Sequence, residues 1–212
     1  MRQHLLAALV ASLCLGAGFG AAPALASDSA GSLAQQALAD CEAGRQSRDR
    51  SERERLFVNG RDLAQRAIAL DDNSADAHFS LFCNQGEWMR LDGESLKDVM
   101  GLRALIRELD RTIELQPDHA GALSAKGTFL VRLPRLLGGD VDRGEAMLHK
   151  VITLDPTAVN ARISLARVCE YRGKKDEGIE YARRALQFAN ELGRADKVAE
   201  AQAILAELGA SY

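Results

Sequence analysis

Small and apolar residues recur at a fixed interval of 34 positions in the C-terminal half of the chain. The earlier set is Gly139, Gly144, Leu148 and Val151, and the later set is Gly173, Gly178, Ala182 and Ala185. Small residues at such positions let two antiparallel helices approach closely, while the larger ones fill the groove beside them. An interval of this length is typical of a repeated helix pair. The pattern therefore predicts a stack of such pairs.

Helical spacing continues through the rest of the chain, and no alternating run of Val, Ile and Thr indicates a strand. Helices are expected over 33–41, 51–70, 75–88, 95–115, 160–171, 175–187 and 195–208, with a further pair between Pro117 and Pro156. The final segment places Val198, Ala201, Ile204 and Leu208 on one face, which can cover the open end of a stack. We predict an all-α fold, a right-handed superhelix of about four helix pairs plus a C-terminal capping helix.

Two of the predicted units are longer than the repeat interval. An insertion of five residues, 133–137, precedes Gly138-Gly139-Asp140, and a longer insertion falls around 89–101. A phosphate-binding loop would need Lys followed by Ser or Thr after the glycines, and this turn lacks them. A structural role is favoured, in which glycine frees the turn and Asp140 caps the next helix.

The first 26 residues have the features of a cleaved leader. Arg2 is followed by a short apolar core, 5–15, and by the small-x-small site Ala24-Leu25-Ala26. We expect cleavage after Ala26, a single domain over 27–212 without a transmembrane segment, and a periplasmic or secreted location. A lipid anchor on Cys14 is disfavoured because a bulky residue precedes it.

Charge and cysteine content narrow the picture further. Removal of the leader leaves a net charge of 26 − 30 = −4, and this mild acidity argues against nucleic-acid binding. Three cysteines remain, which permit at most one internal disulfide. Cys169 occupies a core position of its repeat and is expected to be buried, while a bridge between Cys41 and Cys83 is left open. The stretch 45–55 interleaves arginines with acids, which predicts a solvated helix start with local ion pairs.

Catalytic chemistry finds little support in the residues. His78, His119 and His149 are far apart in the chain and lack the spacing of metal ligands. Neither a Gly-x-Ser-x-Gly nucleophile turn nor a haem-attachment or dinucleotide-binding motif occurs. We expect a protein that is not an enzyme and that holds neither a metal nor a cofactor.

The repeats resemble the tetratricopeptide repeat superfamily over about 33–208. The resemblance implies that the first helix of each pair lines a concave groove that selects a protein or peptide partner. The groove residues it implies are Asn160, Ile163, Arg167 and Tyr171 in one pair and Ser124, Thr128, Val131 and Arg132 in the preceding pair. Guanidinium and amide groups suit a peptide backbone or a carboxylate, and ordinary solvated helix surface is the alternative. Phe79 and Trp88 are candidate anchors, with a core position as the favoured alternative.

A narrower resemblance rests on Ile113-Glu114-Leu115-Gln116-Pro117-Asp118 and the lengthened Pro…Gly-Gly-Asp turn after it. These are similar to the periplasmic T-component proteins associated with TRAP transporters, which implies an oligomer that handles small ligands for a solute-binding partner. The leading hypothesis is an exported adaptor or scaffold that binds a protein or peptide partner in its groove, and TRAP-associated ligand handling is the alternative. Homo-oligomerisation stays open in both. An open polar groove would favour the adaptor, and an enclosed apolar cavity or oligomeric pore would favour ligand handling.

Overall fold

The computed structural model describes residues 29–91 and 99–210, and within them the chain forms nine α-helices, one 3-10 turn and no strand. The helices are α1 (Ala30–Gln46), α2 (Arg50–Leu70), α3 (Ala75–Leu91), α4 (Val99–Leu115), α5 (Ala120–Arg132), α6 (Val141–Leu154), α7 (Val159–Tyr171), α8 (Lys175–Glu191) and α9 (Ala195–Glu207), and the 3-10 turn is η1 (Arg135–Leu137). The predicted all-α repeat fold is confirmed. The leader over 1–26 and the helix start predicted at Ser95 lie outside the described residues.

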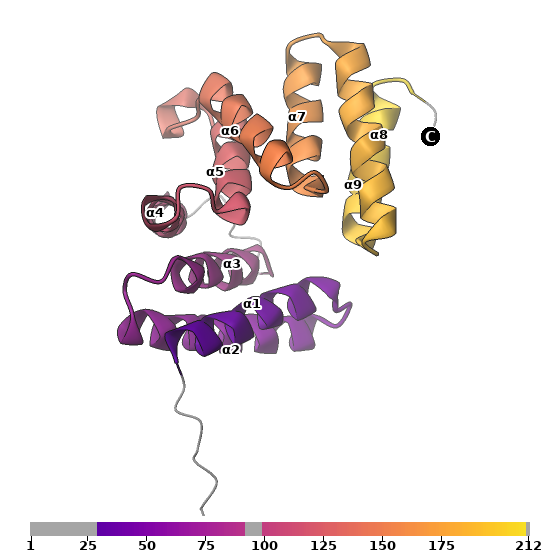
Figure 1. Ribbon diagram of the computed structural model, residues 1–212. Coiled ribbons are helices and arrows are strands. Elements are labelled where there is room, and N and C mark those ends of the chain that lie inside the picture. The colour runs from indigo at the N-terminus through magenta and orange to yellow at the C-terminus, as the bar shows by residue number, and fades with distance from the viewer. Residues whose placement is uncertain (1–28, 92–98, 211–212) are drawn as a thin grey trace, which may run out of the picture.

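The helices pack in chain order as four pairs followed by a single helix. Figure 1 shows α4 nearly end-on beside α3, so the two helices of the second pair cross steeply. Each helix contacts the next along the chain, and α1 with α3, α5 with α7 and α7 with α9 also pack on one another. In Figure 1, α1, α2 and α3 run across the lower part of the view, whereas α7, α8 and α9 stand upright. The direction of the stack therefore changes through the middle pairs.

Small residues stand where helices of a pair cross, as the repeat pattern predicts. A Cβ atom added at Gly144 would lie 2.8 Å from the carbonyl oxygen of Gly127, and one added at Gly127 would lie 3.1 Å from the carbonyl oxygen of Gly144. In the next pair, a Cβ atom at Gly178 would lie 3.2 Å from the Cβ atom of Cys169. The backbones of α5 and α6 therefore touch at a spacing that larger residues would not allow.

The five-residue insertion forms an ordered turn. Gly138 adopts a φ of 89°, and a Cβ atom at Gly139 would lie 1.7 Å from the carbonyl oxygen of Leu133, so both positions require glycine. Asp140 accepts a hydrogen bond of 3.0 Å from the backbone N–H of Arg143 at the start of α6. The predicted cap is confirmed.

Three links, from successive turns of α1, join this helix to α3. The Asn84 amide donates to the Ala37 carbonyl oxygen at 2.8 Å, Cys41 and Cys83 form a disulfide, and Arg45 Nε donates to Glu87 at 2.8 Å. The helix predicted over 33–41 is too short, because α1 begins at Ala30 and continues to Gln46. Its last turn is held by the Arg45 pair and by the close contact of Gly44 with the buried Phe57 ring.

The last helix covers the apolar end of the α7–α8 pair. Ala201, Ile204 and Leu205 are fully buried in one cluster with Ala182 and Ala185 of α8. The predicted capping role of this segment is confirmed. Within the described ranges, no helix has the length and apolarity that crossing a membrane requires.

Candidate functional site

The polar residues expected in the groove lie on α5 and α7, and a hydroxyl pair joins the two helices at their centre. The Thr128 hydroxyl donates to the carbonyl oxygen of Ser124 at 2.8 Å. Since that hydroxyl has one proton, the Ser164 hydroxyl, 2.8 Å away on α7, donates to Thr128. Thr128 is half-buried, and its hydroxyl has both a donor and an acceptor partner within the structure.

Arg167, on α7, binds two carboxylates. Its Nη1 atom donates to Glu170 one turn further along the same helix at 2.9 Å, and it also binds Glu207 on α9. The hydrogen bond to Glu207 raises the pKa of Arg167, and the same bond lowers the pKa of Glu207. The guanidinium thus ties α7 to the end of α9.

Arg132, at the end of α5, reaches past α7 to α9. Its Nη2 atom lies 3.7 Å from a carboxylate oxygen of Glu200, too far for a hydrogen bond. Because α5 packs on α7 and α7 on α9, a straight row would hold the axes of α5 and α9 about 16–20 Å apart. One ion pair spans this row, so the side chains of Arg132 and Glu200 extend toward each other across one side of α7. We call this side the α5–α7–α9 face.

The remaining groove predictions divide between the surface and the core. Asn160 is exposed and has no side-chain hydrogen bond within the described residues, and Tyr171 is 81% exposed. Ile163 was expected on the groove, and this is wrong: it is 4% exposed and packs in the cluster of α8 and α9. At about 100° per residue it lies about 60° around α7 from Asn160 and about 40° from Arg167, at the edge of that face, where α8 and α9 cover it. Val131 also packs partly on the core.

The two candidate anchors, on α3, pack against an apolar cluster that α3, α4 and α5 form together. The Phe79 ring centroid is 4.5 Å from that of His119 and 5.9 Å from that of Phe82. Trp88 packs on the same cluster, and the Arg61 guanidinium lies 5.2 Å from the centre of its ring. Both rings are half-buried, which agrees with the core alternative.

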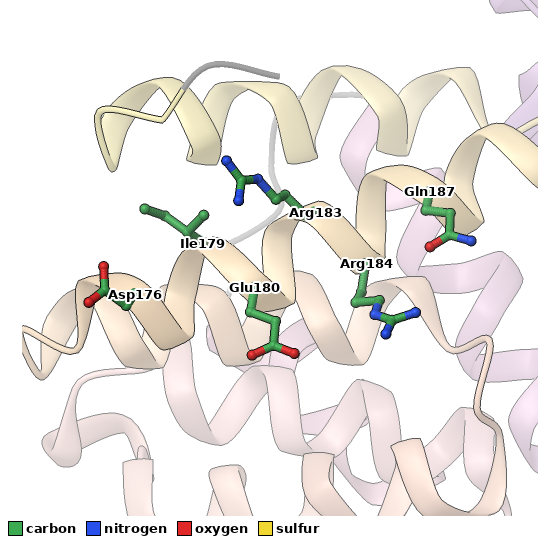
Figure 2. Close-up of a pocket in the computed structure, with 6 residues that line it drawn as sticks. All are labelled: Asp176, Ile179, Glu180, Arg183, Arg184 and Gln187. Carbon is green, nitrogen blue, oxygen red and sulfur yellow. The ribbon is translucent and has the colours of Figure 1, made fainter.

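Two shallow hollows occur on the described surface. One lies on the outer side of α8 and is lined by Asp176, Ile179, Glu180, Arg183, Arg184 and Gln187. Figure 2 shows that all six come from this single helix, so they cannot enclose a ligand. The other adjoins the α5–α7–α9 face, since its lining includes Glu170 and Glu207, the two partners of Arg167. No group of three or more His, Cys, Asp or Glu side chains that could hold a metal occurs in the part of the chain that the structure describes.

The glutamates of α9 were missed by the sequence reasoning, which treated this helix only as a cap. A shift of 36 positions, however, places Ser164 on Glu200 and Tyr171 on Glu207. The α7 and α9 starts, Val159 and Ala195, have the same offset. Alignment of the last segment as a further first helix would have placed Glu207 at the position of the groove candidate Tyr171.

No family model matches the chain, and no curated protein matches it in a sequence comparison. Two solved crystal structures of MamA are similar to it. The first aligns at 20% identity with a TM-score of 0.48, covering 78% of this chain and 81% of that one. The second aligns at 18% identity with a TM-score of 0.40, covering 78% of this chain and 96% of that one. None of these findings supports the narrower resemblance to TRAP-associated proteins.

Proposed function

We propose that this protein is an exported helical-repeat scaffold that binds an extended segment of a partner protein on its α5–α7–α9 face. The observation that carries the proposal is the Arg132–Glu200 pair, which joins polar side chains of α5 and α9 across α7. An extended chain laid across such a row can contact several helices at once, which is how stacked repeats bind.

The face offers the groups that protein recognition uses. Asn160 presents an amide that can both donate to and accept from a peptide backbone. Arg167 and Arg132 present planar guanidinium groups, and Tyr171 presents an exposed aromatic ring. Tyrosine and arginine are enriched among the residues that dominate interface energies.

Two features support export. The leader over 1–26 is one, and the disulfide between Cys41 and Cys83 is the other, because disulfides persist chiefly in oxidising compartments. The surface features favour an adaptor over a small-ligand carrier. The two hollows described above are open to solvent, whereas a carrier would enclose its ligand in an apolar cavity.

A photo-cross-linking amino acid placed at Asn160 in living cells tests partner binding. The matched control carries it at Glu180 on the outer side of α8, which is equally a helix surface (Figure 2). We expect adducts with one envelope protein at 160 and none at 180. Equal adducts at both positions would refute the assignment of the face, and an adduct with a solute-binding protein would favour transport.

Arg132→Ala together with Arg167→Ala should abolish the adduct. The two arginines make three ion pairs, and exposed pairs are worth about 0.2–1 kcal/mol each, so we expect the melting temperature to fall by no more than about 12 °C. Loss of folding would show that these arginines are structural. Cell fractionation with N-terminal sequencing tests export, and protein that keeps its leader in the cytoplasm would contradict it.

A further inference from the structure

We propose that His78 joins α4 to the loop between α2 and α3 as an imidazolium, so that a proton holds this joint of the stack and the joint loosens as the pH rises. His78 stands in the first turn of α3, and its side chain is 7% exposed. Three elements meet at its ring, namely α3, α4 and the loop 71–74. The joint involves no helix of the α5–α7–α9 face, so the inference does not depend on the proposed function.

Both ring nitrogens of His78 face oxygen atoms. Nδ1 lies 2.8 Å from Oε2 of Glu108 on α4, and Nε2 lies 3.1 Å from the carbonyl oxygen of Asp72 in the loop. A carbonyl oxygen and an ionised carboxylate only accept hydrogen bonds, whereas a neutral imidazole has a single N–H to donate. A neutral ring would therefore turn a lone pair toward one of the two oxygens. The geometry requires one more proton, and it belongs on the ring because imidazole is a stronger base than a carboxylate.

The charges around the ring favour its cationic form. The Asp72 carboxylate lies 3.6 Å from Nε2 and adds a second negative charge to that of Glu108. Arg111 of α4 opposes them, since it donates to the Asp72 carbonyl oxygen at 3.3 Å and lies 3.8 Å from the Asp72 carboxylate. The same guanidinium also lies 3.6 Å from Glu114. Acids therefore outnumber the cation at this site, and opposite charge stabilises a protonated ring.

His119, at the start of α5, shows the opposite arrangement. Its Nδ1 atom accepts a hydrogen bond of 3.1 Å from the backbone N–H of Ala122, so this nitrogen carries no proton. The two histidines therefore differ in their number of ring protons, and His119 is an internal reference for His78. His149, which is exposed on α6, is a second reference.

Loss of the proton should weaken the hold of His78 on α4. One of its two hydrogen bonds would become a repulsion between lone pairs, and burial keeps water from replacing the lost partner. Leu105 and Leu109 of α4 pack in one apolar cluster with Trp88 of α3, so a looser α4 would bring the Trp88 ring into contact with water. Trp88 is the only tryptophan of the chain, and its fluorescence therefore reports on this joint.

Nitrogen NMR of the purified protein, labelled with nitrogen-15 at histidine, tests the charge. At about pH 7 we expect both ring nitrogens of His78 to carry a proton, whereas His119 should show one protonated and one unprotonated nitrogen. Spectra of His4→Gln, His119→Gln and His149→Gln assign the other signals, and His78 follows by elimination. In Glu108→Gln the side-chain amide can donate to Nδ1, so the His78 ring should be neutral there at the same pH. A neutral His78 ring in the wild type would overturn the inference.

Urea unfolding at a series of pH values tests the link. A proton that the folded chain holds and the unfolded chain releases makes stability fall as the pH rises, and histidine in an unfolded chain releases its proton near about pH 6.5. The folding constant of the wild type, divided by that of Glu108→Gln, should therefore fall by about tenfold between about pH 6 and about pH 9. His149→Gln removes an exposed histidine and is the matched control, so its pH dependence should follow that of the wild type.

Trp88 emission tests whether α4 loosens. Over the same pH range without urea, the emission maximum of the wild type should move to longer wavelength, and that of Glu108→Gln should stay constant. Circular dichroism at each pH confirms that the helices remain folded. Equal pH dependence of the folding constants in the wild type and Glu108→Gln would refute the proton link, and a constant emission maximum in the wild type would refute the loosening of α4.

Discussion

Removal of the disulfide between Cys41 and Cys83 should cost this protein a large part of its stability. The bond joins residues 42 positions apart and encloses all of α2. In the chain-entropy model, a loop of this size restricts the unfolded chain by about 4 kcal/mol at 25 °C. Since domains are stable by about 5–15 kcal/mol, this single link is a substantial fraction of the total.

The assay compares thermal unfolding of the wild type with Cys41→Ala plus Cys83→Ala. A change of 1 kcal/mol moves the melting temperature of a chain of about 200 residues by about 2–4 °C, so we expect a decrease of about 8–16 °C. The two neighbouring links, Asn84 to Ala37 and Arg45 to Glu87, should keep α1 folded on α3 in the variant.

A third cysteine provides the control. Cys169 is buried but unbonded, so Cys169→Ala removes a buried sulfur without removing a cross-link. It should cost much less than the double variant, and reduction of the wild type should reproduce the double variant. A double variant that melts within about 3 °C of the wild type would refute the loop-entropy reasoning, since less than about 1 kcal/mol would then be at stake.

Three further predictions concern buried groups. Gly60→Ala should lower the free energy of unfolding by about 1–3 kcal/mol, because the new Cβ atom would lie 2.2 Å from Oδ1 of the buried Asn84. In urea titrations, the double variant Gly60→Ala plus Asn84→Ala should lose less free energy of unfolding than the two single variants lose together. Burial alone would raise the pKa of Glu87, but its two arginine partners outweigh burial and hold this pKa below the ordinary value of 4.5. Its contribution is therefore present above the unfolded pKa and is lost as the pH falls through the lower folded pKa, so Glu87→Gln should flatten the fall in stability below about pH 4.5. Burial raises the pKa of the Cys169 thiol to about 11, so Ellman's reagent at pH 8 should label it only after unfolding; rapid labelling of the folded protein would contradict its burial.

Much of the fold could be predicted because the signals are local. Pro117 and Pro156 follow the ends of α4 and α6, where the pattern of leucine, polar residue and proline had predicted helix ends. The last helix could also be predicted to cap the stack, because its apolar residues between Val198 and Leu208 recur at helical spacing and so share one face. The candidate site was harder to predict, since Ile163 lies three positions after Asn160 and four before Arg167, a spacing typical of a shared helix face, and yet it is buried. Helical period alone does not determine which side curves inward.

The sequence by itself determined the repeated helix pair. The crossing of two adjacent helices depends on small residues inside each repeat, such as Gly144 in one repeat and Gly178 in the next. Tertiary structure alone decided that Cys41 pairs with Cys83 and that Arg132 meets Glu200. Residues in these contacts are separated by one or more whole helices. Their distance depends on the curvature of the stack, which is the sum of all the packing angles between them, and no local pattern in the sequence encodes that sum.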